Sequence, residues 1–315
     1  MYPFLDWGIP IIVWLQNLGD WLTPFMETIT FLGDEQFYLL ILPIFVWWVD
    51  VGLGLRIGIS LLLSAGINGS VKLMFGLPRP YWCSPDVKIL SDGTTFGFPS
   101  GHSQNALVVW GRLAVWIRKG WATILLGLII FFIAVSRMYL GVHYPSDVLG
   151  GWLIGGILLW ALVRFDEPVR NWLGRLSVGG QISVVFAISI AILAIGSIAF
   201  FATLDRPLPL CTPAHADPHT ADDFITAAGT LLGMGIGGAL LLDWGEFRTN
   251  VGWPKRIGRY ILGVIGLLAL YLGLSAIFPS GETLIAAIFR YVRYALMGFW
   301  VMYLAPRLFN FMRLA

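Results

Sequence analysis

Three short patterns place histidines and cations in a chain that is otherwise rich in apolar residues. They are Lys72 followed by Arg79-Pro80, then Pro99-Ser100-Gly101-His102, and then Ser136-Arg137 followed by His143 and Asp147. The chain has only four histidines among 315 residues, and two of them fall in these patterns. Transfer of a phosphoryl group needs neutralised charge, a nucleophile in line and a proton for the leaving oxygen. The three patterns contain a residue type for each of these tasks.

The cations of the patterns are Lys72, Arg79 and Arg137. Guanidinium groups match phosphate oxygens bidentately and lysine adds a point charge, so these side chains suit a phosphate. Ser100 and Gly101 stand where an apolar helix is predicted to begin, and the free N–H groups of a first helical turn bind anions. We therefore expect both residues to contact the phosphate as well. We expect no metal and no cofactor, because the three cations supply the charge that magnesium supplies in other phosphoryl-transfer enzymes.

His143 is the natural nucleophile among these residues, because Asp147 follows it by four positions. A carboxylate at that spacing can orient the imidazole and hold its useful tautomer, as in a catalytic triad. His102 is then left to protonate the departing oxygen as a general acid.

Each of these residues also has an ordinary structural explanation. His102 alone suits a solvated helix end, Arg137 alone suits a membrane-surface anchor, and Ser100 alone suits a helix N-cap. Ionisable groups at membrane depth are costly and are functional by default. Their occurrence at three junctions between loops and helices therefore favours a catalytic site.

The composition indicates an integral membrane protein. The chain is 57% hydrophobic and 12% charged, with a mean hydropathy of +0.79, whereas a soluble chain carries roughly 25% charged residues. Its apolar residues occur in runs of roughly 18 to 25, long enough to cross a bilayer as helices. No block of basic residues exists to bind nucleic acid, so the expected partners are membrane lipids and the substrate.

We expect an all-α, polytopic bundle of about nine transmembrane helices. The predicted spans are 36–50, 53–77, 100–117, 121–141, 146–164, 181–203, 223–243, 258–278 and 284–305. Residues 1–35 form a predicted interfacial segment, with Trp7, Trp14 and Trp21 at spacings of seven. The first residues show no pattern of a cleaved signal peptide. The remaining chain divides into an expected catalytic core at 36–203, an extracytoplasmic loop at 204–222 and an appended three-helix unit at 223–315.

The order of the spans places both motif-bearing loops on one face of the membrane, because two spans separate them. Most other cations fall on the opposite face, namely Arg56, Arg118, Lys119, Arg164, Arg170, Arg175, Arg248, Lys255, Arg256, Arg307 and Arg313. The motif face has little beyond Lys88 and Arg206. The positive-inside rule therefore predicts an extracytoplasmic site, an external N-terminus and a cytoplasmic C-terminus.

At every signature position the three patterns resemble those of the type 2 phosphatidic acid phosphatase and vanadium haloperoxidase superfamily. The resemblance covers residues 72–147 by motif and the six-span core by layout. It implies that Lys72, Arg79, Ser100, Gly101 and Arg137 bind phosphate. It also implies that His143 becomes phosphohistidine beside Asp147 and that His102 is the general acid. The haloperoxidase branch is soluble, so the predicted transmembrane spans argue against membership of that branch.

The substrate stays open between two phosphate esters. Nine spans and the stretch Phe75-Gly76-Leu77-Pro78-Arg79-Pro80-Tyr81-Trp82 resemble the glucose-6-phosphatase branch. Many relatives with these motifs instead act on lipid phosphates such as phosphatidic acid, phosphatidylglycerol phosphate or prenyl diphosphates, and no sugar pocket is recognisable here. We favour a lipid phosphatase. A non-catalytic transporter or scaffold is disfavoured because both histidines are present.

Three further features leave alternatives open. Cys83 and Cys211, the only cysteines, both fall on the predicted outer face, where a disulfide is allowed. Cys211, His215 and His219 recur every four residues, as metal ligands can, but Pro213 and Pro218 favour a plain solvated loop. Arg290 and Arg293 fall within the last span, where they can reach lipid headgroups. Oligomeric state is not predicted.

Overall fold

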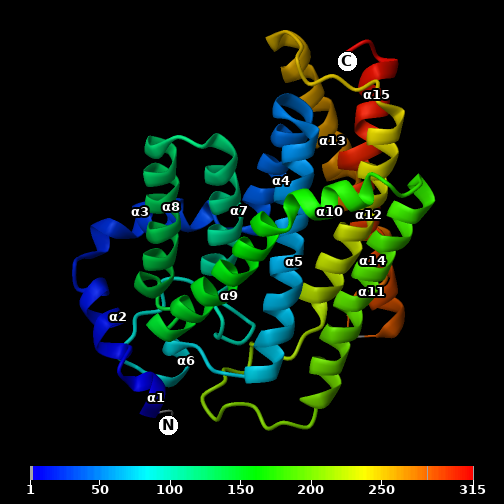
Figure 1. Cartoon of the computed structure of the whole chain (residues 1–315). Helices are drawn as coiled ribbons and strands as arrows, with labels where there is room; N and C mark the ends of the chain where they lie inside the picture. The colour runs from blue at the N-terminus through cyan, green and yellow to red at the C-terminus, as the bar shows by residue number, and fades with distance from the viewer. Residues whose placement is uncertain (1–2, 282, 315) are drawn as a thin grey trace. The chain divides into compact units, whose positions relative to one another are not determined.

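The protein is built from helices that fold into two compact units (Figure 1). The computed structural model describes residues 3–281 and 283–314, and this part of the chain contains no β-strand. Unit 1 comprises Met1–Tyr38, Ile67–Ala161 and Gly196–Thr220. Unit 2 comprises Leu39–Gly66, Leu162–Ile195 and Ala221–Ala315. The expected all-α membrane bundle is thus confirmed.

Unit 1 contains the helices that flank the three patterns. Its helices are α1 (Pro3–Asp6), α2 (Ile9–Gln16), η1 (Asp20–Leu22), α3 (Thr23–Phe31), α6 (Pro80–Cys83), α7 (Gly101–Ile117), α8 (Gly120–Tyr139) and most of α9 (Pro145–Arg164). The C-terminal part of α5 (Val51–Phe75) and the end of α11 (Val178–Ala202) also belong to this unit. The loop joining α7 and α8 lies at the opposite end of unit 1 from the loops before α7 and after α8 (Figure 1).

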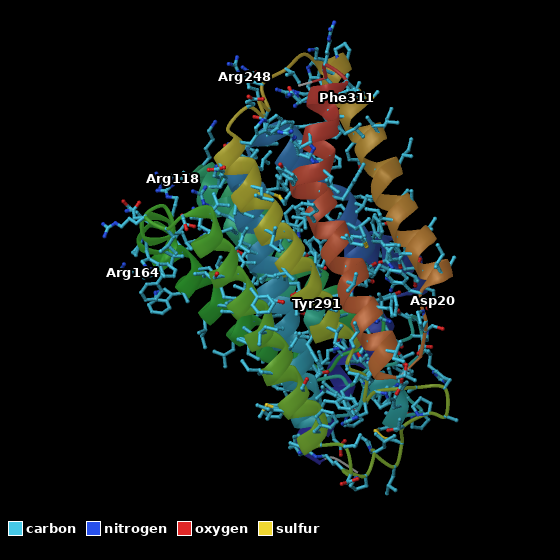
Figure 2. The ribbon with its side chains drawn as sticks, turned by 90° about the vertical axis from the view of Figure 1, so that its right-hand side faces the viewer. Asp20, Arg118, Arg164, Arg248, Tyr291 and Phe311 are labelled. Carbon is cyan, nitrogen blue, oxygen red and sulfur yellow. A yellow bond between two sulfur atoms is a disulfide. The ribbon has the colours of Figure 1, made fainter. Side chains whose placement is uncertain are left out.

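Unit 2 contains most of α4 (Glu35–Ile44) and the C-terminal helices. It also contains the N-terminal part of α5, most of α11, and η2 (Phe45–Val49), α10 (Asp166–Leu173), α12 (Asp222–Trp244), α13 (Trp253–Ile277), α14 (Leu284–Phe299), η3 (Trp300–Leu304) and α15 (Ala305–Phe311). Arg248 and Phe311 lie at one end of this unit, and Tyr291 lies farther along α14 (Figure 2).

Small residues bring α12 and α14 together in unit 2. A Cβ atom added at Gly229, Gly233 or Gly298 would collide with the backbone of the facing helix. Such close approach of helix backbones is typical of packing in bilayers, where little hydrophobic force drives helices together. Ser189 of α11 also contacts both helices, since its hydroxyl donates to the Ala228 carbonyl of α12 at 2.8 Å and lies 2.8 Å from the Tyr291 hydroxyl of α14.

The expectation of nine spans is not confirmed. Seven helical segments in the described residues are long and apolar enough to cross a membrane: Val51–Cys83, Gly120–Tyr139, Pro145–Arg164, Val178–Ala202, Asp222–Trp244, Trp253–Ile277 and Leu284–Phe311. The pair Asp20–Phe31 and Glu35–Val49, bent by 50°, gives an eighth if it counts as one span. The expected span 36–50 is only one arm of this pair. The expected span 100–117 is α7, which has 17 residues and buries polar Ser103, Gln104 and Arg112.

The N-terminal segment packs on unit 1 through one face. Leu5, Ile12 and Leu15 are buried in a cluster with residues of α6 and of the end of α8, while Trp7, Trp14 and Trp21 are exposed. The Gln16 amide donates to the carbonyls of Lys88 and Tyr139, each at 2.9 Å. The segment is therefore anchored to the loops that carry the three patterns. Its placement at a membrane interface stays a prediction, and Met1 and Tyr2 lie outside the described residues.

Candidate active site

The loops that follow α5 and α8 meet at the start of α7 in unit 1. The backbone N–H of Ser100 donates to the carbonyl of Asp147 at 3.0 Å, which joins the second pattern to the third. A guanidinium N–H of Arg79 donates to the carbonyl of Val142 at 3.0 Å, which joins the first pattern to the third. The structure therefore brings the three patterns together, as the order of the spans requires.

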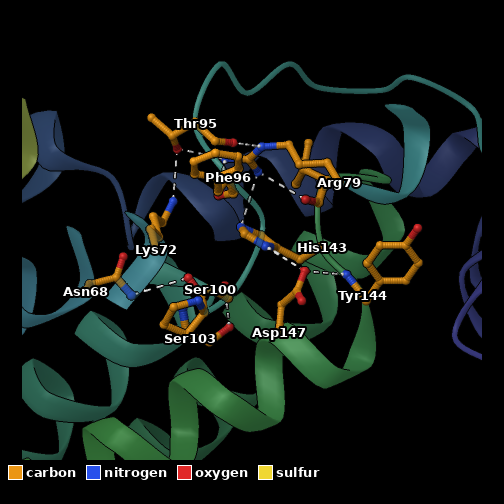
Figure 3. A network of polar contacts seen from close by, with 12 residues as sticks. Asn68, Lys72, Arg79, Thr95, Phe96, Ser100, Ser103, His143, Tyr144 and Asp147 are labelled. Atoms are coloured by element: carbon orange, nitrogen blue, oxygen red, sulfur yellow. Dashed lines mark hydrogen bonds and ion pairs between the residues drawn. The ribbon is translucent and has the colours of Figure 1, made fainter. Parts of the chain in front are cut away.

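Arg79 and Lys72 converge on Thr95, in the loop before α7 (Figure 3). Lys72 Nζ donates to Thr95 Oγ1 at 3.0 Å. Arg79 donates through Nη2 to the same hydroxyl at 3.1 Å and through Nε to the Thr95 carbonyl at 2.7 Å. Both cations are buried. Thr95 was not predicted, because nothing in its sequence context distinguishes it from other loop residues.

His143 lies between Arg79 and Asp147 (Figure 3). Its Nδ1 is 3.3 Å from Asp147 Oδ2, and its Nε2 is 3.4 Å from Arg79 Nη1. Asp147 Oδ2 also accepts the backbone N–H of Tyr144 at 2.9 Å, so the carboxylate is fixed by the loop whose histidine it holds. Asp147 is fully buried, and the exposed fraction of the His143 side chain is 2%. The predicted pair is thus in contact, with Nε2 as the nitrogen that faces the cation.

Burial lowers the pKa of His143 well below its usual value, and the nearby Arg79, Arg137 and Lys72 lower it further. The ring is therefore neutral at physiological pH, which is the form that can act as a nucleophile. With Nδ1–H directed at Asp147, the lone pair lies on Nε2.

The start of α7 is shaped by Ser100 and Gly101. Ser100 is the N-cap, since its hydroxyl oxygen accepts the N–H of Ser103, so the capping role considered from the sequence is present. A Cβ added at Gly101 would lie 3.0 Å from Asn68 Oδ1, which leaves little room there for any other residue. The Asn68 amide donates to Gln104 Oε1 at 2.9 Å and to the Pro99 carbonyl at 3.3 Å. Asn68 stands one turn before Lys72, and that spacing is the only signal that could have indicated it.

The end of α3 and the turn that follows it contribute two residues that the sequence did not indicate, Thr30 and Asp34. Arg137 donates through Nη1 to Thr30 Oγ1 at 2.7 Å, and its buried Nε has no hydrogen-bond partner within the described part of the chain. His102 Nε2 lies 2.6 Å from Asp34 Oδ1. Both contacts join residues more than sixty positions apart, so no local pattern could predict them.

A disulfide between Cys83 and Cys211 ties the loop after α11 to the end of α6. Its Cα atoms are 5.0 Å apart, within the usual range. In the same region the Tyr81 hydroxyl donates to Asp92 at 2.5 Å, and this hydrogen bond lowers the pKa of Asp92.

Cys211 is therefore not available as a metal ligand. The histidines near it are engaged with protein groups, because His215 Nε2 lies 3.4 Å from Asp92 and His219 Nε2 lies 2.9 Å from the Thr203 hydroxyl. Across the residues that the structure describes, no three His, Cys, Asp or Glu side chains are grouped as a metal site. The two arginines of the last span lie in unit 2, where Arg290 pairs with Asp222 at 2.6 Å and Arg293 stacks on Tyr294.

Residues 53–170 match the PAP2 superfamily, and residues 225–315 match the PAP2 superfamily phosphatase transmembrane extension. Phosphatidylglycerophosphatase B of Bacillus subtilis is 32% identical over 171 residues, which cover 48% of this chain and 79% of the relative. A dihydrosphingosine 1-phosphate phosphatase of Saccharomyces cerevisiae is 30% identical, over 52% of this chain and 46% of the relative.

The undecaprenyl-diphosphatase BcrC of Bacillus subtilis is 31% identical, over 36% of this chain and 58% of the relative. The chain thus covers only about half of the latter two relatives. No solved structure matches it. The three patterns meet at one buried site, and the chain matches two family models and most of the length of the Bacillus subtilis phosphatidylglycerophosphatase. This chain therefore belongs to the PAP2 superfamily of phosphatases.

Proposed function

We propose that this multi-pass membrane phosphatase hydrolyses a lipid phosphate through a phosphohistidine formed on His143. The observation that carries this proposal is the orientation of His143, whose Nδ1 faces Asp147 and whose Nε2 faces Arg79. An in-line nucleophile needs its lone pair directed at phosphorus and a cation beside the phosphate oxygens. The arrangement of Nε2 beside a guanidinium supplies both.

In the first step, His143 Nε2 attacks phosphorus, the P–O bond to the leaving group breaks, and His102 gives a proton to the leaving oxygen. In the second step, water attacks the phosphohistidine, its proton passes to His102, and inorganic phosphate is released with His143 restored. Lys72, Arg79 and Arg137 neutralise the charge on the equatorial oxygens in both steps. The N–H groups at Ser100 and Gly101 add hydrogen bonds to the same oxygens.

The proposed substrate class is a lipid phosphate. The relatives found are a phosphatidylglycerophosphatase, a sphingoid-base phosphate phosphatase and an undecaprenyl-diphosphatase, all acting on lipids by name. The candidate site lies where membrane-spanning helices end, so a phosphate can enter while its acyl or prenyl chain stays in the bilayer. Each CH₂ group buried in the bilayer adds about 0.8 kcal/mol to membrane binding.

A phosphate-release panel on the purified protein tests the substrate. We expect long-chain phosphatidic acid, phosphatidylglycerol phosphate or a prenyl diphosphate to have a much higher kcat/KM than glucose 6-phosphate. If glucose 6-phosphate is preferred and mannose 6-phosphate is clearly worse, the lipid proposal is wrong and a sugar-phosphate enzyme replaces it. Absence of phosphate release from every ester would favour a non-catalytic role.

We place the site on the extracytoplasmic face, with the N-terminus outside and the C-terminus in the cytoplasm. The support is the excess of Lys and Arg in the loops of the other face, together with the Cys83–Cys211 disulfide, since disulfides persist in oxidising compartments.

The native cysteines are bonded to each other, so an introduced cysteine can be labelled alone. We expect Asp86→Cys, but not Lys119→Cys, to react with a membrane-impermeant thiol reagent in intact cells, and the opposite pattern would reverse the orientation.

We also keep the proposed division into a catalytic core at 36–203, a loop at 204–222 and an appended unit at 223–315. The match of the transmembrane extension to residues 225–315 supports a separate C-terminal unit.

A further inference from the structure

The end of α3 and the turn between α3 and α4 contact two residues of the candidate site from outside the region that matches the PAP2 superfamily. That match begins at residue 53, whereas Thr30, Gly33 and Asp34 precede it. Thr30 accepts a hydrogen bond from Arg137, and Asp34 contacts His102. A Cβ added at Gly33 would lie 3.1 Å from His102 Cδ2, so the backbone passes directly beside the imidazole. This segment is therefore in direct contact with residues of the candidate site.

The Asp34–His102 contact is short and partly shielded from water. The distance is 2.6 Å, and the exposed fractions of the two side chains are 23% for His102 and 31% for Asp34. Charge-assisted hydrogen bonds have such short distances and are about twice as strong as neutral ones. A carboxylate in this position favours the doubly protonated imidazole ring.

The other charges near His102 are positive, opposite in sign to Asp34. Burial, Arg137 on α8 and Lys72 on α5 all disfavour an imidazolium, and Asp34 is the carboxylate that opposes them. A general acid must carry its proton while it stands among the cations that hold the phosphate. This requirement gives Asp34 a chemical task beyond folding.

Asp34 also stands at the N-terminus of α4, where an aspartate often caps a helix. Capping would not require a contact with His102, and it would be served equally by asparagine. Replacement by asparagine therefore separates the two roles, because it keeps the capping ability and removes the charge.

We infer that Asp34 is a positioning residue for the reaction, which holds the Nε2–H of His102 and stabilises its imidazolium so that Nδ1 delivers the proton to the leaving oxygen. When the P–O bond breaks, the Nδ1 proton moves to the leaving oxygen, and His102 becomes neutral with its remaining N–H still donated to Asp34. Water returns a proton to Nδ1 when the phosphohistidine is hydrolysed. This inference rests on the proposed role of His102 as general acid.

Two small esters of similar size test the inference on the full-length protein. Phenyl phosphate has a poor leaving group that needs a proton, whereas 4-nitrophenyl phosphate has a good leaving group that does not. For Asp34→Asn we expect kcat/KM to fall roughly 10- to 100-fold with phenyl phosphate and to change little with 4-nitrophenyl phosphate. Asp34→Glu should recover part of the loss, because it restores the carboxylate.

Asp20→Asn is the matched control. Asp20 lies in the same N-terminal segment and pairs with Lys88 at 3.0 Å, with 76% of its side chain exposed, far enough into solvent that the pair contributes little. We expect this variant to treat both esters as the unchanged protein does. An equal loss on both esters in Asp34→Asn, or no loss on either, would overturn the inference in favour of a purely structural residue.

His102→Ala separates this inference from the proposal on which it rests. If His102→Ala loses activity mainly with phenyl phosphate and Asp34→Asn does not, the role of Asp34 alone is wrong. If His102→Ala lowers kcat/KM, which reports only the first step, equally with both esters, His102 is not the general acid, and the inference about Asp34 is overturned together with that assignment.

Discussion

The site holds two histidine–aspartate pairs that differ in sequence separation, in burial and in the ring nitrogen that faces the carboxylate. His143 and Asp147 are four residues apart, fully buried, and joined through Nδ1 at 3.3 Å. His102 and Asp34 are 68 residues apart, partly exposed, and joined through Nε2 at 2.6 Å. Burial and the surrounding cations keep His143 neutral. Burial and cations also act against a charged His102, but there the short contact with Asp34 opposes them.

This contrast fits the two protonation states that the proposed chemistry requires. A nucleophile must be deprotonated at the attacking nitrogen, and a general acid must be protonated. In enzymes with two titratable groups of one type, the surroundings decide which group plays which role. In the proposed chemistry the local carboxylate orients a neutral ring, and the distant carboxylate offsets part of the burial and cation repulsion that disfavour a charged one.

The largest effect is expected when the proposed nucleophile is removed. We expect His143→Ala to lower kcat by about 10⁴-fold or more, because loss of an attacking group removes the covalent route altogether. Phosphate release from the preferred lipid substrate measures this effect. Acid-labile labelling of His143 during turnover should also disappear in the variant. Turnover similar to that of the unchanged protein would refute the phosphohistidine mechanism.

A milder effect is expected when only the orientation of the nucleophile is lost. Asp147→Asn keeps the size of the side chain but no longer selects the tautomer with Nδ1–H. By analogy with triads, its effect on kcat should be roughly a hundredfold smaller than that of His143→Ala. Steady-state rates of the two variants, measured side by side, check the ratio. Equal losses would indicate that Asp147 is as essential as the nucleophile itself.

The same two pairs show what the sequence could and could not predict. The contact of His143 with Asp147 follows from their closeness in sequence, since Asp147 lies in the first turn of α9 beside the loop that carries His143. The meeting of the three patterns follows from the number of spans between them. The contact of Asp34 with His102 depends on how a bent N-terminal helix pair packs on unit 1, which no local pattern records.

The count of nine transmembrane helices is not confirmed. The sequence pattern measures only length and apolar character, whereas α7 has 17 residues and buries polar side chains such as Gln104 and Arg112. The disulfide partners were likewise candidates from the sequence, but only folding brings their Cα atoms to 5.0 Å.

A smaller effect is expected in the pH dependence of the reaction, which tests the charge state of His143. The pKa of His143 is lowered, so this histidine stays neutral as the pH falls through about 6.5, the ordinary histidine value. With 4-nitrophenyl phosphate, which needs little help from the general acid, kcat/KM should therefore hold between about pH 7 and about pH 6. A steep loss across this range would mean that His143 titrates like an exposed histidine, and that Arg79 and burial do not set its charge.

The smallest effect is expected from removing metal ions. Lys72, Arg79 and Arg137 already place three positive charges around the site, and its two carboxylates, Asp147 and Asp34, each lie against a histidine. EDTA should therefore leave phosphate release nearly unchanged, while vanadate should inhibit by adopting the geometry of pentavalent phosphorus between His143 and the cations. Phosphate release with and without EDTA, and with added magnesium or zinc, measures this directly. Complete loss with EDTA, restored by either ion, would show that charge neutralisation at the site depends on a metal and would remove the reason for assigning it to the three side chains.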